Sequence, residues 1–96
     1  MSNEVIADEL FKKCKFILGD RELDYNDDDK NKDALDHITN MWSVYLGKTL
    51  TRSDVCYMLF LLKVARELIH HKEDNIIDAI NYLVLYQNEK DNEDIQ

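Results

Sequence analysis

Three polar residues lie on one side of an otherwise apolar segment near the C-terminal end of the chain. Asp74, Asp78 and Asn81 follow i, i+4, i+7 spacing, which places them on one stripe of a helix. Most other positions from Ile76 to Tyr86 are apolar, so this stripe need not face open water. Two carboxylates one helical turn apart are suited to a hard cation such as Mg²⁺, completed by water and phosphate. The alternative is an ordinary solvated face of a helix.

The preceding segment contains basic residues that would suit these acids. Arg66 falls in the middle of an apolar helical face, and Lys63 lies at the edge of that face. A guanidinium keeps its charge, so a buried one needs a carboxylate or phosphate partner. We therefore predict that Arg66 and Asp78 are coupled across two neighbouring helices, with Lys63 as the other candidate partner. The alternative is an arginine whose stem packs while its head reaches water.

The densest acidic stretch, DYNDDDKNKD at residues 24–33, is a second source of candidate metal ligands. Asp24 or Asp27 would have to complete a site begun by Asp74 and Asp78. The stretch does not fit a calcium-binding EF-hand, because neither register places glycine at position six and glutamate at position twelve. A solvated loop is the alternative interpretation.

Hydrophobic periodicity predicts four helices, over residues 3–18, 30–46, 51–70 and 73–88, joined by short loops. Gly19 and Gly47 stand where the first two should end, and Ser2 and the Thr51–Asp54 segment are typical helix starts. We expect one compact all-α domain over residues 1–88, an antiparallel four-helix bundle, followed by a frayed polar tail over 89–96. The third helix should be the most buried, with Trp42 and Tyr45 in the core.

Composition limits the partners that this domain can have. The 96 residues include 20 acidic and 12 basic ones, a formal charge of −8, which disfavours a nucleic-acid duplex or an anionic membrane. Cys14 and Cys56 are isolated in apolar segments and should be reduced and buried. The N-terminal segment is acidic and amphipathic, unlike a signal peptide, so we expect a cytoplasmic protein. So short a chain would gain core by forming a homo-oligomer, most simply a dimer.

Residues 21–83 resemble a small family of mostly bacteriophage-encoded proteins of uncharacterised function. The shared pattern includes an R-x-x-x-Y motif, an asparagine, W-S-x-Y-L-G, D-V, K-x-A-R and D-N-x-x-D-x-x-x-Y. Asn26 stands where that family usually has glycine. The positions that match are Arg21, Tyr25, Asp27, Asn31, Trp42, Tyr45, Gly47, Asp54, Lys63, Arg66, Asp78 and Tyr82.

The last third of the chain is also similar to the MazG-like all-α nucleotide pyrophosphohydrolases. That resemblance implies a helical oligomer that binds Mg²⁺ through helix-borne acids and cleaves nucleoside triphosphates between the α and β phosphates. It implies metal binding by Asp74 and Asp78 and phosphate binding by Lys63 and Arg66. The Glu-x-x-Glu pair of active MazG-like enzymes is not evident, because KKCKF stands where the first helix would carry it. Nucleotide binding would survive this loss better than turnover.

Three functions follow as hypotheses: a Mg²⁺-dependent nucleotide pyrophosphohydrolase, a non-catalytic binding protein, and a helical module without a ligand. A non-catalytic phage protein would sequester a nucleotide signal or occupy a host protein with its acidic surface. In the first two cases the site should accept a phosphate-bearing molecule. We expect its ligand-binding residues to be Lys63, Arg66, Tyr25, Asn31 and Tyr82, and its metal ligands to be Asp74, Asp78, Asp24 and Asp27.

Overall fold

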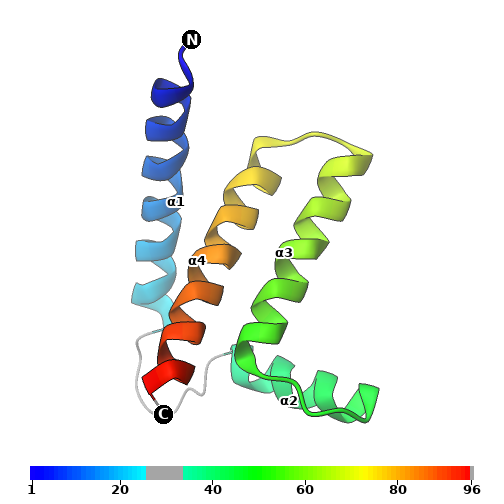
Figure 1. Ribbon diagram of the computed structural model, residues 1–96. Helices are drawn as coiled ribbons and strands as arrows, with labels where there is room; N and C mark the ends of the chain where they lie inside the picture. The colour runs from blue at the N-terminus through cyan, green and yellow to red at the C-terminus, as the bar shows by residue number, and fades with distance from the viewer. Residues whose placement is uncertain (26–33, 96) are drawn as a thin grey trace.

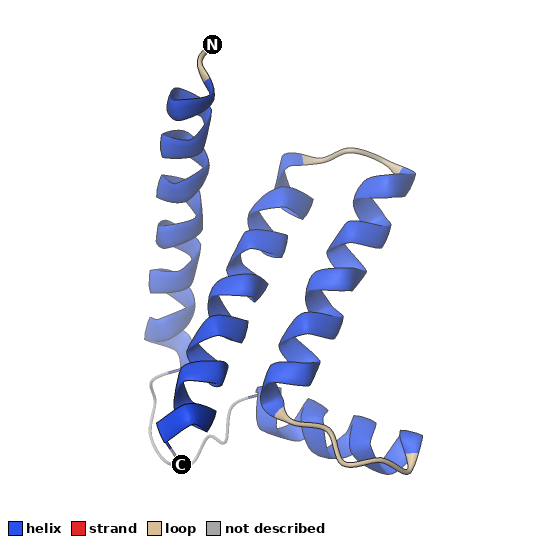
Figure 2. Cartoon of the chain, in the orientation of Figure 1, coloured by secondary structure: helices blue, strands red, loops and turns tan. Residues whose placement is uncertain are grey.

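A computed structural model describes the backbone of residues 1–25 and 34–95 and the side chains of residues 1–19 and 34–93. Over these residues the chain is helical, with no strand (Figure 2). The four helices are α1 (Asn3–Tyr25), α2 (Ala34–Leu46), α3 (Arg52–Ile69) and α4 (Glu73–Ile95). The predicted all-α class and number of helices are therefore confirmed for the described part of the chain.

Three of the helices, α1, α4 and α3, run alongside one another, and α2 lies across the lower end of α3 (Figure 1). The helices α3 and α4 form an antiparallel hairpin, and α4 packs between α3 and α1. The direction of α1 is the same as that of α4, while α2 extends from the foot of α3 on the side away from α4. The predicted antiparallel packing thus describes the α3–α4 pair, whereas α1 and α2 are arranged differently.

Local signals set most of the helix ends. The hydroxyl of Ser2 accepts a hydrogen bond from the Val5 amide at 3.2 Å, which confirms Ser2 as the cap of α1. At the start of α3 the Thr51 hydroxyl accepts from the Asp54 amide, and the Asp54 carboxylate accepts from the Thr51 amide. This reciprocal pair is the predicted capping box, completed by aspartate.

Gly47 ends α2 as predicted. Its φ of +65° lies in the left-handed region that glycine adopts without steric cost. The amide of Lys48 donates to the Ser43 carbonyl at 3.1 Å, and the Gly47 amide donates to the Val44 carbonyl at 3.2 Å. Together these bonds form a Schellman motif, which satisfies the last carbonyls of the helix.

Two predicted helix ends are wrong. The helix α1 continues through Gly19 to Tyr25, because one glycine costs a helix only about 1 kcal/mol. The helix α4 continues past Asn88 to Ile95, through the segment expected to be a frayed tail. Contacts of Glu89 and Glu93 with α3 stabilise this extension.

The buried core of the described residues is small. Its hydrophobic members are Cys14, Val55, Cys56 and Ile77. The first turns of α3 are buried as predicted, but the second half of α3 is mostly exposed. On α2, Trp42 is half-buried and Tyr45 is 88% exposed, so the prediction of a core position is wrong for Tyr45. No described helix is long and apolar enough to cross a membrane.

Candidate functional site

The predicted acidic stripe of α4 runs from solvent into the core. Asp74 is exposed, Asp78 is half-buried, and Asn81 is completely buried. The stripe is therefore not an ordinary solvated face of a helix. It brings one carboxylate and one carboxamide into the region where α1, α3 and α4 meet.

At the middle of the stripe Asp78 pairs with Lys63 of α3. The Lys63 Nζ lies 3.1 Å from the Asp78 Oδ2, and the two side chains are only 14% and 20% exposed. Water screens such a pair far less than a surface pair, so its attraction is stronger. The structure thus brings together two of the predicted site residues, one from each helix of the α3–α4 hairpin.

Asn81 lies one turn further along α4, on the same side as Asp78. Its side chain is fully buried, and neither its carboxamide nitrogen nor its oxygen has a hydrogen-bond partner. Leaving such a buried group unpaired costs about 1–3 kcal/mol, and native proteins do so rarely. Helical spacing predicts the place of Asn81 on the stripe but no role for it; the available signal is a polar residue within an apolar segment.

On the other side of α4, Cys14 of α1 completes this region. The Cys14 Sγ lies 3.8 Å from the Ile77 carbonyl oxygen. Burial raises the pKa of the Cys14 thiol, and the negative charge of Asp78 raises it further. Cys14 therefore stays a neutral thiol close to Asp78. We call Cys14, Lys63, Asp78 and Asn81 the central polar cluster.

Arg66 is not coupled to Asp78 in the way the sequence suggested. Its side chain is exposed one turn above Lys63, and it is Lys63 that forms the ion pair with Asp78. The expectation of a buried Arg66 is therefore wrong, since its place on the apolar face turns out to be at the surface. Arg66 nevertheless keeps its charge accessible beside the central polar cluster.

A polar network closes the end of the hairpin near Arg66. The carboxylate of Glu67 accepts hydrogen bonds from the Lys72 amide at 3.1 Å and the Asn75 side chain at 3.3 Å, and it pairs with His71. Burial acts to raise the pKa of Glu67, but these bonds outweigh it and the net shift is downward. The network joins the last turn of α3 to the first turn of α4.

Lysines lie close to the acids that were predicted to bind metal. Lys13 of α1 pairs with Glu73, and the hydrogen bond to Glu73 raises the pKa of Lys13, with smaller contributions from Glu9 and Asp74. Lys63 is the counterpart at Asp78. Two ammonium groups thus supply positive charge where the MazG-like resemblance implies a metal ion.

The predicted metal site is not completed by the described residues. Among them no group of three or more His, Cys, Asp or Glu side chains could hold a metal ion. The remaining predicted ligands fall elsewhere: the side chain of Asp24 is not described, and Asp27 lies outside the described residues. The same holds for Tyr25 and Asn31 among the predicted ligand-binding residues, while Tyr82 is half-buried on α4. The Mg²⁺ site remains a prediction.

A second polar cluster, at the other end of the α3–α4 hairpin, was missed. Arg52 donates to both carboxylate oxygens of Glu89, at 3.0 and 3.1 Å, and also pairs with Asp36 of α2. Beside it, the Ser53 hydroxyl donates to Glu93 at 2.6 Å. The sequence pattern indicated Arg52 and Ser53 only as part of a capping segment, because Glu89 and Glu93 lie in the segment expected to be a frayed tail.

Comparison with protein families gives one match. The model of a domain of unknown function, DUF6378, matches residues 9–90 of the chain. The chain belongs to the DUF6378 family. This match confirms the expected membership of a family of uncharacterised function; phage origin and MazG similarity remain predictions. No curated protein and no solved structure matches the chain. Membership in DUF6378 thus supplies no activity, and the case for a function rests on the central polar cluster.

Proposed function

We propose that this DUF6378 protein binds a phosphate-bearing small molecule, of the nucleotide class, at the central polar cluster and does not turn it over. The observation that carries the proposal is Asn81. A fully buried carboxamide without a partner, one turn from a half-buried ion pair, is an unmet hydrogen-bonding demand that a polar ligand would satisfy.

Two cations support phosphate as the ligand group. Arg66 is exposed one turn from Lys63, so both can reach a phosphate that enters at this point of the hairpin. The chain as a whole is strongly acidic, and its general field repels polyanions. A phosphate would therefore have to be held by local cations, and Lys63 would contact both Asp78 and the phosphate.

The nearby lysines favour binding without a metal. Lys13 and Lys63 already neutralise acids of α4, so a phosphate group does not need Mg²⁺ to approach them. Turnover of the MazG-like kind is the second candidate function. Turnover would require Asp24 or Asp27 as a metal ligand in addition to Asp74 and Asp78. A nucleotide-binding protein of either kind suits the cytoplasm.

A thermal-shift screen with a nucleotide panel, with and without Mg²⁺, tests the proposal. We expect stabilisation by at least one nucleotide in the absence of metal. In Lys63→Met and Arg66→Gln this stabilisation should fall, because each loses a charge-assisted contact of about 1.5–3 kcal/mol. Lys15→Met is the matched control, since Lys15 is an exposed lysine of α1.

The other outcomes each have a meaning. Stabilisation that requires Mg²⁺, with release of pyrophosphate, would support the pyrophosphohydrolase and contradict binding without turnover. Absence of stabilisation by every nucleotide would contradict both and favour a protein partner. If Lys15→Met loses as much of the nucleotide-induced stabilisation as the other two variants, the effect is one of net charge and not of a binding site.

A further inference from the structure

The charged and apolar sides of α3 are reversed relative to those of an ordinary surface helix. From Val55 to Ile69 its charged residues are Lys63, Arg66 and Glu67, and two of these contact α4. The side of the helix away from α4 is apolar and open to solvent. Its exposed members are Leu61, Leu62, Val64, Leu68 and Ile69, and Tyr57 lies at the edge of this side, with its ring centroid 5.4 Å from that of Tyr86 on α4. An amphipathic helix in water normally presents the opposite arrangement.

The whole chain is also less compact than a monomer of its size. A folded monomer of 11.4 kDa exposes about 5,800 Å², whereas this chain exposes 7474 Å². Its radius of gyration is 15.0 Å, against about 12.5 Å for a compact domain of 96 residues. The excess of roughly 1,700 Å² exceeds the roughly 800 Å² that each partner buries in a stable interface.

The occupant of this surface must be present whenever the chain is made, because the chain buries so little core by itself. A second copy meets that condition. Two chains that each carry a charge of −8 repel one another, so a largely uncharged surface is the most favourable place for them to meet. The outer side of α3 is such a surface.

Three residues on that side, together with Tyr57 at its edge, define a geometry for such a contact. Tyr57, Leu61, Val64 and Leu68 have spacings of four, three and four residues, which is the pattern of a helix–helix contact stripe. The spacing reads the same in both directions. In an antiparallel pair, Tyr57 of one copy would face Leu68 of the other, and Leu61 would face Val64. A two-fold axis at the middle of the stripe therefore makes it self-complementary.

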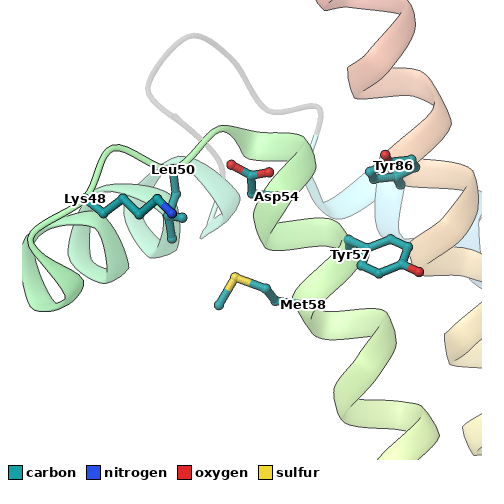
Figure 3. Close-up of a pocket in the computed structure, with 6 residues that line it drawn as sticks. All are labelled: Lys48, Leu50, Asp54, Tyr57, Met58 and Tyr86. Atoms are coloured by element: carbon teal, nitrogen blue, oxygen red, sulfur yellow. The ribbon is translucent and has the colours of Figure 1, made fainter.

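The foot of α3 offers space for the other copy. An open hollow of about 390 Å³ lies between the α2–α3 connection, α3 and α4, and it is lined by Lys48, Leu50, Asp54, Tyr57, Met58 and Tyr86 (Figure 3). An antiparallel partner would place its Leu68 at this hollow, and its exposed Lys72 near Asp54. A parallel partner would instead bring Asp54 against Asp54.

We propose that the protein is a two-fold symmetric homodimer formed by antiparallel packing of the outer sides of α3, with Leu68 of each copy seated in the hollow of the other. The dimer buries the apolar side of α3. It does not involve the central polar cluster, which lies on the side of α3 toward α4 in each copy. The proposal stands whether or not that cluster binds a phosphate.

Light scattering at tens of micromolar protein, with circular dichroism to verify folding, tests the dimer. Wild type should have twice the chain mass of 11.4 kDa, and its Tm should rise with protein concentration. Leu68→Glu should raise the dissociation constant at least tenfold. Phe16→Glu is the matched control, because Phe16 is 76% exposed on α1 and Leu68 is 83% exposed on α3; it should remain dimeric.

A mixing experiment tests the antiparallel register. Leu61→Lys and Val64→Glu should each weaken the dimer, and an equimolar mixture should restore it, because position 61 of one copy then faces position 64 of the other. In a parallel pair position 61 would face position 61, so mixing would relieve like-charge repulsion without forming this ion pair, and the mixture would stay weaker than wild type. A monomeric wild type, a Tm independent of concentration, an undisturbed Leu68→Glu dimer or a mixture without rescue would each overturn the proposal as stated.

Discussion

The Lys63–Asp78 pair offers a sharp test of how the central polar cluster stabilises the fold. Exposed ion pairs contribute about 0.2–1 kcal/mol, whereas breaking a fully buried pair costs about 3–5 kcal/mol because one charge is left without a partner. With exposures of 14% and 20% and a separation of 3.1 Å, this pair lies between these limits. We expect Lys63→Met and Asp78→Asn each to cost about 2–3 kcal/mol.

The double variant should lose about 1–2 kcal/mol less than the sum of the single losses, because each single substitution already removes the same ion pair. Urea unfolding at one fixed protein concentration measures all four proteins of the cycle. Lys13→Met with Glu73→Gln is the matched control: that pair is 51% and 54% exposed, and its coupling should stay below about 1 kcal/mol. Additive losses for Lys63 and Asp78 would show that their pairing does not stabilise the fold.

Two further predictions concern the foot of the α3–α4 hairpin. Arg52→Met should cost about 2 kcal/mol in urea unfolding, since Glu89, 14% exposed, loses a two-bond partner; no loss would refute the pairing. The Ser53 hydrogen bond lowers the pKa of Glu93 from its ordinary 4.5. This stabilisation is complete above pH 4.5 and is lost as pH falls through the folded-state value. Thermal unfolding at pH 7 and pH 3 should therefore differ less for Ser53→Ala than for wild type; an equal difference would contradict this.

Periodicity and end signals predicted the elements well, because they depend on neighbouring residues. The capping box at Thr51 and the left-handed Gly47 are both local, and both are confirmed. The predicted end of α1 at Gly19 is wrong because a glycine lowers helix stability without forbidding a helix. The C-terminal extension of α4 depends on contacts with Arg52 and Ser53, which lie far away in sequence. No local sequence pattern therefore predicts it.

For the candidate site, too, the sequence predicts what depends on spacing along one helix and not what depends on how two helices pack. The stripe of α4 and a basic partner on α3 follow from helical spacing. The choice between Lys63 and Arg66 does not, because it depends on how α3 is rotated against α4. That rotation puts Lys63 inside and Arg66 at the surface. The apolar side of α3 predicts burial within the chain, whereas the structure leaves this side exposed.

The most direct test of ligand binding at the central polar cluster is the side-chain amide signal of Asn81 in a ¹⁵N–¹H NMR titration with the nucleotides of the panel, in metal-free buffer. Comparison with an Asn81→Asp spectrum identifies the signal, and the exposed Asn3 of α1 serves as the internal control. We predict that a binding nucleotide shifts the Asn81 signals and leaves those of Asn3 in place. A nucleotide that binds without moving the Asn81 signals, or a panel in which none binds, would contradict the assignment of this cluster as the site.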